Sequence, residues 1–164
     1  LSTVQCMDTQ LPERLFSIAE GYGVSPSEIN LEITESAMVY SINTMRSVME
    51  ELTKDGFSFA LDDFGTGRAN LSYLQNFPFR IIKVDKSFLW ADGESEDNHV
   101  IFENMLSLIR GLRREAVAEG VETKEQRDML ISHGVEYLQG FYYSKPVPEQ
   151  EFMKYLEEFE AAKQ

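Results

Sequence analysis

The 164-residue chain has only one cysteine, Cys6, and no long run of apolar residues. A single cysteine excludes an intramolecular disulfide and a cysteine-based zinc site. Short apolar runs exclude a transmembrane helix, and the first ten residues, LSTVQCMDTQ, lack the basic and apolar regions of a signal peptide. We therefore expect a cytoplasmic domain without direct membrane insertion, although a longer parent protein could be tethered through other regions.

Histidines are also scarce, since the chain has only His99 and His133. They are far apart in sequence and each lies in a helical pattern, so we expect neither a catalytic pair nor a metal-binding pair. Cys6 has no basic neighbour in the sequence, which argues against a reactive thiol.

Acidic residues outnumber basic ones, since the chain has 28 Asp and Glu but only 15 Lys and Arg, which gives a formal net charge of −13. This balance excludes binding of a nucleic-acid polymer, which needs clustered positive charge. A small phosphate ligand remains compatible with the charge, provided that divalent cations lie between carboxylate and phosphate.

A unit of one β-rich run followed by one amphipathic helical pattern recurs along the chain. The runs lie at 29–36, 57–65, 80–88, 114–122 and 135–143. Their Ile, Val, Leu and Phe content is typical of buried parallel strands. The helical stripes lie at 42–52, 101–112, 123–133 and 152–159, and the acidic stretch 92–98 is predicted to be a surface loop. Alternating strands and helices predict an α/β domain with a parallel sheet.

Two architectures fit this alternation, a doubly wound sheet and a TIM-type (β/α) barrel. No G-x-G-x-x-G follows the first strand, and polar residues end at least five successive strands, which favours the barrel. We count five strands, or six if residues 1–5 begin another, whereas a closed barrel has eight. The chain, residues 1–164, is therefore predicted to be a single incomplete (β/α) barrel.

The polar groups at the predicted strand ends form one constellation, listed here in chain order: Glu32, Glu35, Asp62, Asp63, Lys83, Asp85, Glu119, Glu122 and Gln139. Clustered carboxylates repel one another unless a cation joins them. Oxygen ligands alone suit Mg²⁺ or Mn²⁺. Two such ions about 4 Å apart could clamp the attacking and leaving oxygens of a phosphoester, and the Asp62-Asp63 doublet offers a bridging carboxylate.

Each of these residues also has an ordinary interpretation. A carboxylate after a strand often caps the next helix, Lys83 alone could be a solvated lysine, and Gln139 alone indicates little. The string DDFGTG (62–67) is different, because two acids before Gly-Thr-Gly are poorly suited to cap a helix and are typical of a ligand-binding loop.

The chain resembles the EAL family of bacterial cyclic-di-GMP phosphodiesterases. The matching strings are LEITES (31–36), LDDFGTG (61–67), IIKVDKSF (81–88), VAEGVET (117–123) and LQGFYYSKPVP (138–148). The resemblance implies a TIM-type barrel that hydrolyses cyclic-di-GMP to linear pGpG with Mg²⁺ or Mn²⁺. It also implies metal ligation by Glu32 and Asp62 at a first ion, and by Asp62, Asp63 and Glu119 at a second.

The same resemblance assigns the other roles. Lys83 corresponds to the lysine that holds the nucleophilic water, and Glu119 to a proposed general base. Glu35 corresponds to the glutamate that anchors the DDFGTG loop, and Gln139 and Asp63 lie beside the substrate.

The Glu-Ala-Leu motif that names the family is absent from the sequence, and so is the family's asparagine metal ligand. We therefore expect a partial EAL domain, its C-terminal two-thirds, with an impaired first metal site and weak or no activity. Arg68, Ala69 and Asn70 also replace small serine-rich residues usual in the loop.

Exposed strand edges predict a homodimer or a strand-exchanged oligomer. The alternatives are a non-catalytic module that binds cyclic-di-GMP or a protein partner, and a metal-dependent barrel enzyme with another substrate.

Overall fold

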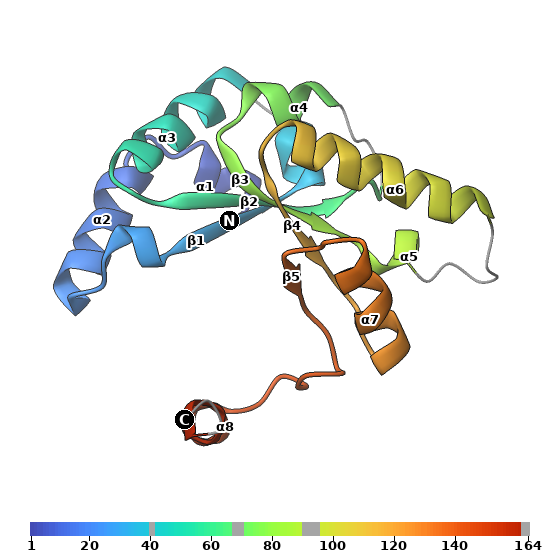
Figure 1. Ribbon diagram of the computed structural model, residues 1–164. Helices are drawn as coiled ribbons and strands as arrows, with labels where there is room; N and C mark the ends of the chain where they lie inside the picture. The colour runs from blue at the N-terminus through green and yellow to red at the C-terminus, as the bar shows by residue number, and fades with distance from the viewer. Residues whose placement is uncertain (40–41, 67–70, 90–95, 162–164) are drawn as a thin grey trace.

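The computed structural model describes residues 1–39, 42–66, 71–89 and 96–161. Five strands form one parallel sheet whose spatial order is the chain order (Figure 1). The strands are β1 (Asn30–Thr34), β2 (Ser58–Phe64), β3 (Phe79–Val84), β4 (Glu115–Ala118) and β5 (Tyr137–Leu138). Within these described residues the sheet has two edges, β1 and β5.

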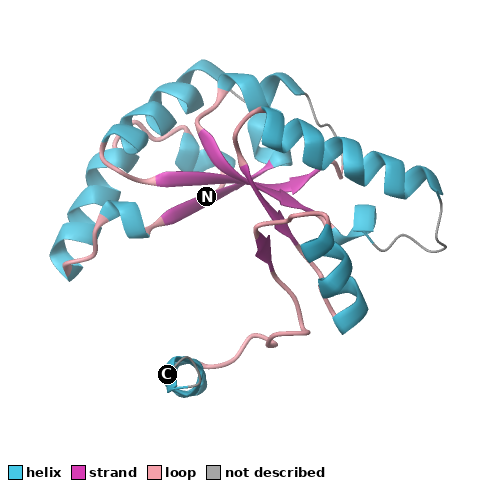
Figure 2. Cartoon of the chain, viewed as in Figure 1, coloured by secondary structure: helices cyan, strands magenta, loops and turns pink. Residues whose placement is uncertain are grey.

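Helices connect the strands and cover one side of the sheet (Figure 2). Three helices precede β1: α1 (Thr3–Cys6), α2 (Leu11–Tyr22) and the 3₁₀ turn η1 (Pro26–Glu28). The crossovers contain η2 (Glu35–Val39), α3 (Ile42–Lys54), α4 (Leu71–Asn76), α5 (Lys86–Leu89), α6 (Glu96–Gly111) and α7 (Lys124–Ser132). Parallel neighbours in sequential order with helical crossovers are the repeating unit of a (β/α) barrel, so the predicted incomplete barrel of five strands is confirmed.

The core lies between the sheet and its helices. Most of the predicted apolar face of α3 is buried, since Met45, Val48, Met49 and Leu52 are each at most 4% exposed, whereas Ile42 at its start is 41% exposed. The four buried residues pack in one cluster with the β2 side chains, among which Phe59 is fully buried. The helix expected at 123–133 is α7, and it begins with a capping box in which the Thr123 hydroxyl accepts from the backbone amide of Gln126.

Three local predictions differ from the structure. Residues 1–5 begin no sixth strand, because the Ser2 side chain accepts from the Gln5 amide and caps α1. The buried face of α6 is centred on Phe102, Leu106 and Ile109, whereas Ile101 is 43% exposed. Part of the acidic stretch 92–98 is helical, since α6 begins at Glu96; residues 92–95 lie outside the described ranges.

The last helix, α8 (Glu149–Ala161), stands apart from the sheet at the end of an extended segment (Figure 1). Its predicted apolar stripe exists, but Phe152, Tyr155 and Phe159 are 41–50% exposed and the helix has no buried residue. Among the helices that the structure describes, none is both long enough and apolar enough to cross a membrane.

Candidate metal centre and active site

Side-chain alternation along the strands turns four charged residues to one face of the sheet. Glu32 of β1 pairs with Ala60 of β2, and Asp62 lies two residues beyond Ala60 and thus on the same face. Lys83 of β3 and Glu119, directly after β4, occupy the corresponding positions on the next two strands. The four groups converge at the carboxyl ends of the strands, where barrel enzymes place their sites.

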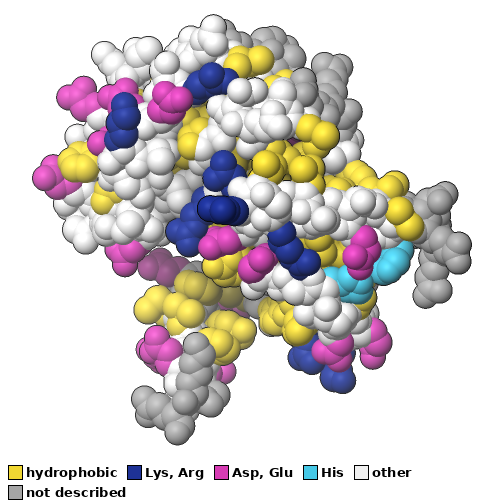
Figure 3. Space-filling view, turned by 45° about the horizontal axis from the view of Figure 1, so that its top comes forward, with side chains coloured by type: hydrophobic (Ala, Val, Ile, Leu, Met, Phe, Trp, Pro, Cys, Tyr) yellow, Lys and Arg dark blue, Asp and Glu magenta, His cyan; other side chains and the backbone are white. Residues whose placement is uncertain are grey.

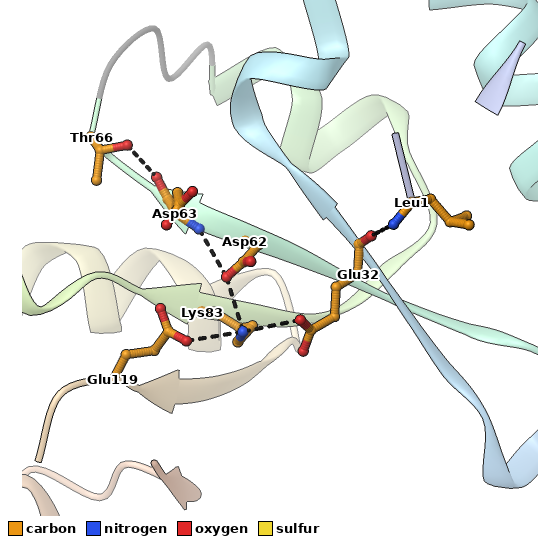
Figure 4. A network of polar contacts seen from close by, with 7 residues as sticks. All are labelled: Leu1, Glu32, Asp62, Asp63, Thr66, Lys83 and Glu119. Atoms are coloured by element: carbon orange, nitrogen blue, oxygen red, sulfur yellow. Dashed lines mark hydrogen bonds and ion pairs between the residues drawn. The ribbon is translucent and has the colours of Figure 1, made fainter. Parts of the chain in front are cut away.

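Lys83 lies at the centre of this cluster (Figure 4). Its Nζ is 2.9 Å from Oε1 of Glu119, 3.0 Å from Oδ1 of Asp62 and 3.2 Å from Oε2 of Glu32. The Lys83 side chain is only 6% exposed, whereas that of Glu32 is 48% exposed. The ammonium therefore joins carboxylates from three strands, and the ordinary interpretation of Lys83 as a solvated lysine is wrong.

Burial and charge shift the pKa values of these groups in a consistent pattern. Burial disfavours the charged form of Lys83, but hydrogen bonds to Glu119 and Asp62 outweigh it and raise the pKa of the ammonium. Burial also raises the pKa of Glu119, and the attraction of Lys83 is offset by the nearby charges of Asp62 and Asp63. The pKa of Asp63 is raised first by burial and then by Asp62. One ammonium thus leaves the carboxylates with unbalanced negative charge.

Asp62, Asp63 and Glu119 fit a divalent cation. Each offers a carboxylate oxygen, and the three oxygens lie within 4.8 Å of one another. Hard ions such as Mg²⁺, Mn²⁺ and Ca²⁺ prefer such an oxygen-only set. Of the predicted first-ion ligands, Asp62 belongs to this group, while Glu32 lies on the other side of Lys83 and contacts its ammonium (Figure 4).

The first three residues of the predicted DDFGTG loop belong to β2, and Asp63 among them has an unusual backbone conformation. Asp63 has φ of +57°, which is rare for a residue other than glycine. The Thr66 hydroxyl donates to the Asp63 carbonyl, and the Gly65 amide donates to Oε2 of Glu35 at 3.1 Å. Glu35 is 3% exposed, so a buried carboxylate holds the start of the DDFGTG loop. The predicted loop residues 68–70 lie outside the described ranges.

The remaining strand-end residues have different environments. Asp85 caps α5, since its Oδ1 accepts from the Ser87 amide at 2.9 Å, and the ordinary interpretation therefore holds for it. Glu122 is exposed. The backbone of Gln139 bonds to Ala118 and Val121 at the end of β4, and its side chain is exposed near the same end of the sheet.

The two histidines lie much closer together than their separation in the sequence suggests. Their rings lie 5.5 Å apart, and His133 contacts Glu103 of α6. His99 and Glu103 are four residues apart on one helix and therefore share a face, a spacing that could have identified the cluster. Cys6 is 1% exposed and burial raises the pKa of its thiol, which agrees with an unreactive cysteine.

Parallel strands with clustered carboxylates and a buried lysine at their carboxyl ends define a (β/α)-barrel protein with a candidate metal centre. A comparison with sequence models of protein families matches residues 1–146 to the EAL domain. The chain therefore belongs to the EAL domain family.

Individual relatives agree with this membership. The chain is 44% identical over 123 residues to the cyclic di-GMP phosphodiesterase PdeL of Escherichia coli, covering 75% of this chain and 34% of PdeL. The solved EAL domain of Mycobacterium smegmatis DcpA has a TM-score of 0.89 and 34% identity, with 96% of this chain and 71% of that domain covered. Klebsiella pneumoniae BlrP1, solved as a manganese and cyclic-di-GMP complex, has a TM-score of 0.78 and 31% identity. The match covers 85% of this chain and 36% of the BlrP1 chain.

The chain spans only 34% of the length of PdeL. It spans 17% of the signaling protein YkoW of Bacillus subtilis. These relatives thus contain long regions that have no counterpart in the matched segment.

Proposed function

We propose that this chain carries the site of a metal-dependent phosphodiesterase that hydrolyses cyclic-di-GMP to linear pGpG. The observation that carries the proposal is the cluster of Asp62, Asp63 and Glu119 around the buried ammonium of Lys83. Support also comes from PdeL, which is a cyclic di-GMP phosphodiesterase, and from BlrP1, which has been solved with manganese and cyclic-di-GMP.

Asp62, Asp63 and Glu119 are the residues that would hold the cation, with Mg²⁺ or Mn²⁺ as its identity. A bound divalent cation would supply electrostatic stabilisation of the negative charge that develops on the phosphate oxygens. Glu32 is proposed as a further ligand on the β1 side, where it already shares Lys83 with Asp62.

Lys83 and Glu119 are proposed to prepare the attacking water. The ammonium of Lys83 stays charged at neutral pH because its pKa is raised, so it can donate a hydrogen bond to a water and fix its position. The carboxylate of Glu119, which contacts this ammonium, is proposed to accept the proton of that water. Their 2.9 Å contact places donor and acceptor side by side.

Glu35 and Gln139 are proposed to position the loop and the substrate without taking part in bond breaking. Glu35 holds the Gly65 amide and thereby the loop that presents Asp63, so it is a positioning residue. Gln139 has an exposed side chain at the end of β5 and is proposed to contact a guanine or ribose of the substrate. Asp63 would lie between the cation and the substrate.

The test is conversion of cyclic-di-GMP to pGpG with Mn²⁺, followed by chromatography. We expect Glu119→Gln to lower turnover by about 10²–10⁴-fold, while the exposed Glu122→Gln, a matched control on the same loop, retains the wild-type rate. Slow wild-type turnover would agree with the impaired first metal site expected from the sequence. Binding of cyclic-di-GMP without any detectable turnover would contradict the proposal and favour the non-catalytic module instead.

A further inference from the structure

The only two histidines of the sequence, His99 and His133, meet on the surface away from the carboxylate cluster. Glu103 completes the group, and the three side chains each offer a ligand atom within 4.8 Å of the others. The two imidazole side chains lie together beside an acidic group in Figure 3. They are held by α6 and by the end of α7, which are separate crossovers of the barrel.

Helix α6 and the end of α7, which carry these side chains, contact each other directly. Arg110 of α6 donates to the backbone carbonyl of His133, directly after α7. The ring of Phe102, a buried residue of α6, lies 6.0 Å from the His133 ring. The spacing of the ligands is thus set by packing and not by the exposed side chains alone, which favours a preorganised site.

The His133 ring has an oxygen neighbour at each of its two nitrogens. Nδ1 lies 2.8 Å from the Met129 carbonyl, which only accepts, so Nδ1 must carry a proton. Nε2 lies 2.7 Å from Oε1 of Glu103, a second acceptor. A neutral imidazole has one proton and can satisfy only one of these two neighbours. With Nδ1 as the donor, Nε2 directs its lone pair towards Glu103, and a cation bound by both groups would satisfy both.

We propose that His99, Glu103 and His133 form a binding site for a first-row transition-metal cation of the Zn²⁺ type. Two imidazoles with one carboxylate are a frequent ligand set for Zn²⁺ with three protein ligands and one open position. The Nδ1 contact of His133 to a backbone carbonyl is the outer-shell bond that metal-binding histidines usually make. Tetrahedral ligands about 2 Å from a zinc ion lie about 3.3 Å apart, so the 2.7 Å contact between His133 and Glu103 must open through a small rotation of the exposed Glu103 side chain.

The ligand chemistry separates this site from the carboxylate centre. Mg²⁺ prefers oxygen ligands and water and is not selected by imidazole, whereas Zn²⁺ is. Cys6 does not compete for Zn²⁺, because it is buried and lies in another part of the fold. A Zn²⁺ titration in excess Mg²⁺ therefore reports on the histidine group, and the outcome does not depend on whether cyclic-di-GMP is hydrolysed.

The experiment is a Zn²⁺ titration of ¹⁵N-labelled protein in excess Mg²⁺, followed through the imidazole nitrogen resonances. Since the chain has two histidines, both rings can be followed individually. We expect both to shift together and saturate at one equivalent. His99→Ala should abolish the His133 shift, and Glu103→Gln should weaken affinity by at least about 10–100-fold, the loss typical of outer-shell changes. Glu125→Gln, an exposed glutamate of α7, serves as control and should titrate like the wild type.

Two outcomes would overturn the proposal. Rings that do not shift with Zn²⁺ would mean that the group binds no zinc and that the contact between His133 and Glu103 is only structural. An equal affinity in Glu103→Gln and Glu125→Gln would mean that Glu103 is no ligand. Both variants change exposed side chains, so loss of folding does not confuse either outcome.

Discussion

Nζ of Lys83 lies 2.9 Å from Oε1 of Glu119 and thereby joins the ends of β3 and β4. The pair is unequal, because the lysine is 6% exposed and meets three carboxylates, while Glu119 also faces the charges of Asp62 and Asp63. The surroundings therefore stabilise the charged form of Lys83 but not the charged form of Glu119. This imbalance leaves net negative charge around Lys83, which favours binding of a further positive ion beside the lysine.

The carboxylate cluster is predicted to bind Mn²⁺ through Asp62. Replacing Asp62 with Asn keeps the shape and removes one negative charge, so Mn²⁺ affinity should fall sharply. Calorimetric titration of metal-free protein measures the affinity. Asp128→Asn is the matched control, since Asp128 is a surface residue paired with Lys124 and should leave binding unchanged. Equal titration curves for the two variants would refute the assignment.

Metal-free protein should lose stability as pH rises through the raised pKa of Glu119. The folded state holds this proton above the ordinary glutamate range, where the unfolded chain has released it. The contribution is therefore present at low pH and is lost towards neutral pH. Melting temperature across mildly acidic to neutral pH should fall less in Glu119→Gln than in wild type. Glu122→Gln should follow the wild-type curve; if it matched Glu119→Gln instead, the pH effect would have another origin.

Gly65 and Gly21 should respond to alanine in opposite directions. Gly65 has φ of +97°, and a Cβ there would lie 2.7 Å from the Phe88 ring, so Gly65→Ala should lower the free energy of unfolding by about 1–3 kcal/mol. Gly21 lies in α2 with nothing near its Cβ position, so Gly21→Ala should raise it by about 0.5–1 kcal/mol. Urea denaturation measures both. A neutral Gly65→Ala would show that the loop can relax.

Self-association is predicted from the exposed apolar face of α8 and the open sheet edges. Phe152 is 49% exposed and Phe159 is 50% exposed, and unpaired strand edges invite pairing with a second chain. Phe152→Asp should shift the protein towards monomer in light scattering. Gln150→Asp adds the same charge to the same helix and should not. A monomeric wild-type protein across the micromolar range would contradict this prediction.

Much of the sheet and of the carboxylate cluster could be predicted from the sequence, because both depend on local patterns. Strand-end position brings Asp62, Lys83 and Glu119 together once the sheet is parallel, whatever the details of the loops. The cap at Thr123 was equally accessible, since a capping box involves residues only three apart.

Other features depend on contacts that no local pattern records. His99 and His133 meet because α6 and α7 pack side by side, and sequence distance alone suggested that they were apart. Asp85 looked like a candidate ligand, but its position directly before α5 makes it a cap. The apolar stripe of α8 predicted a buried face, while the structure leaves it exposed.

The most direct test of the account is the position of Mn²⁺ in crystals of the protein. Anomalous scattering locates the ion independently of any assay. We expect a peak bonded to carboxylate oxygens of Asp62, Asp63 and Glu119, with Lys83 retained beside Glu119. A map with no peak among these three carboxylates, and with Lys83 alone joining Asp62 to Glu119, would contradict it.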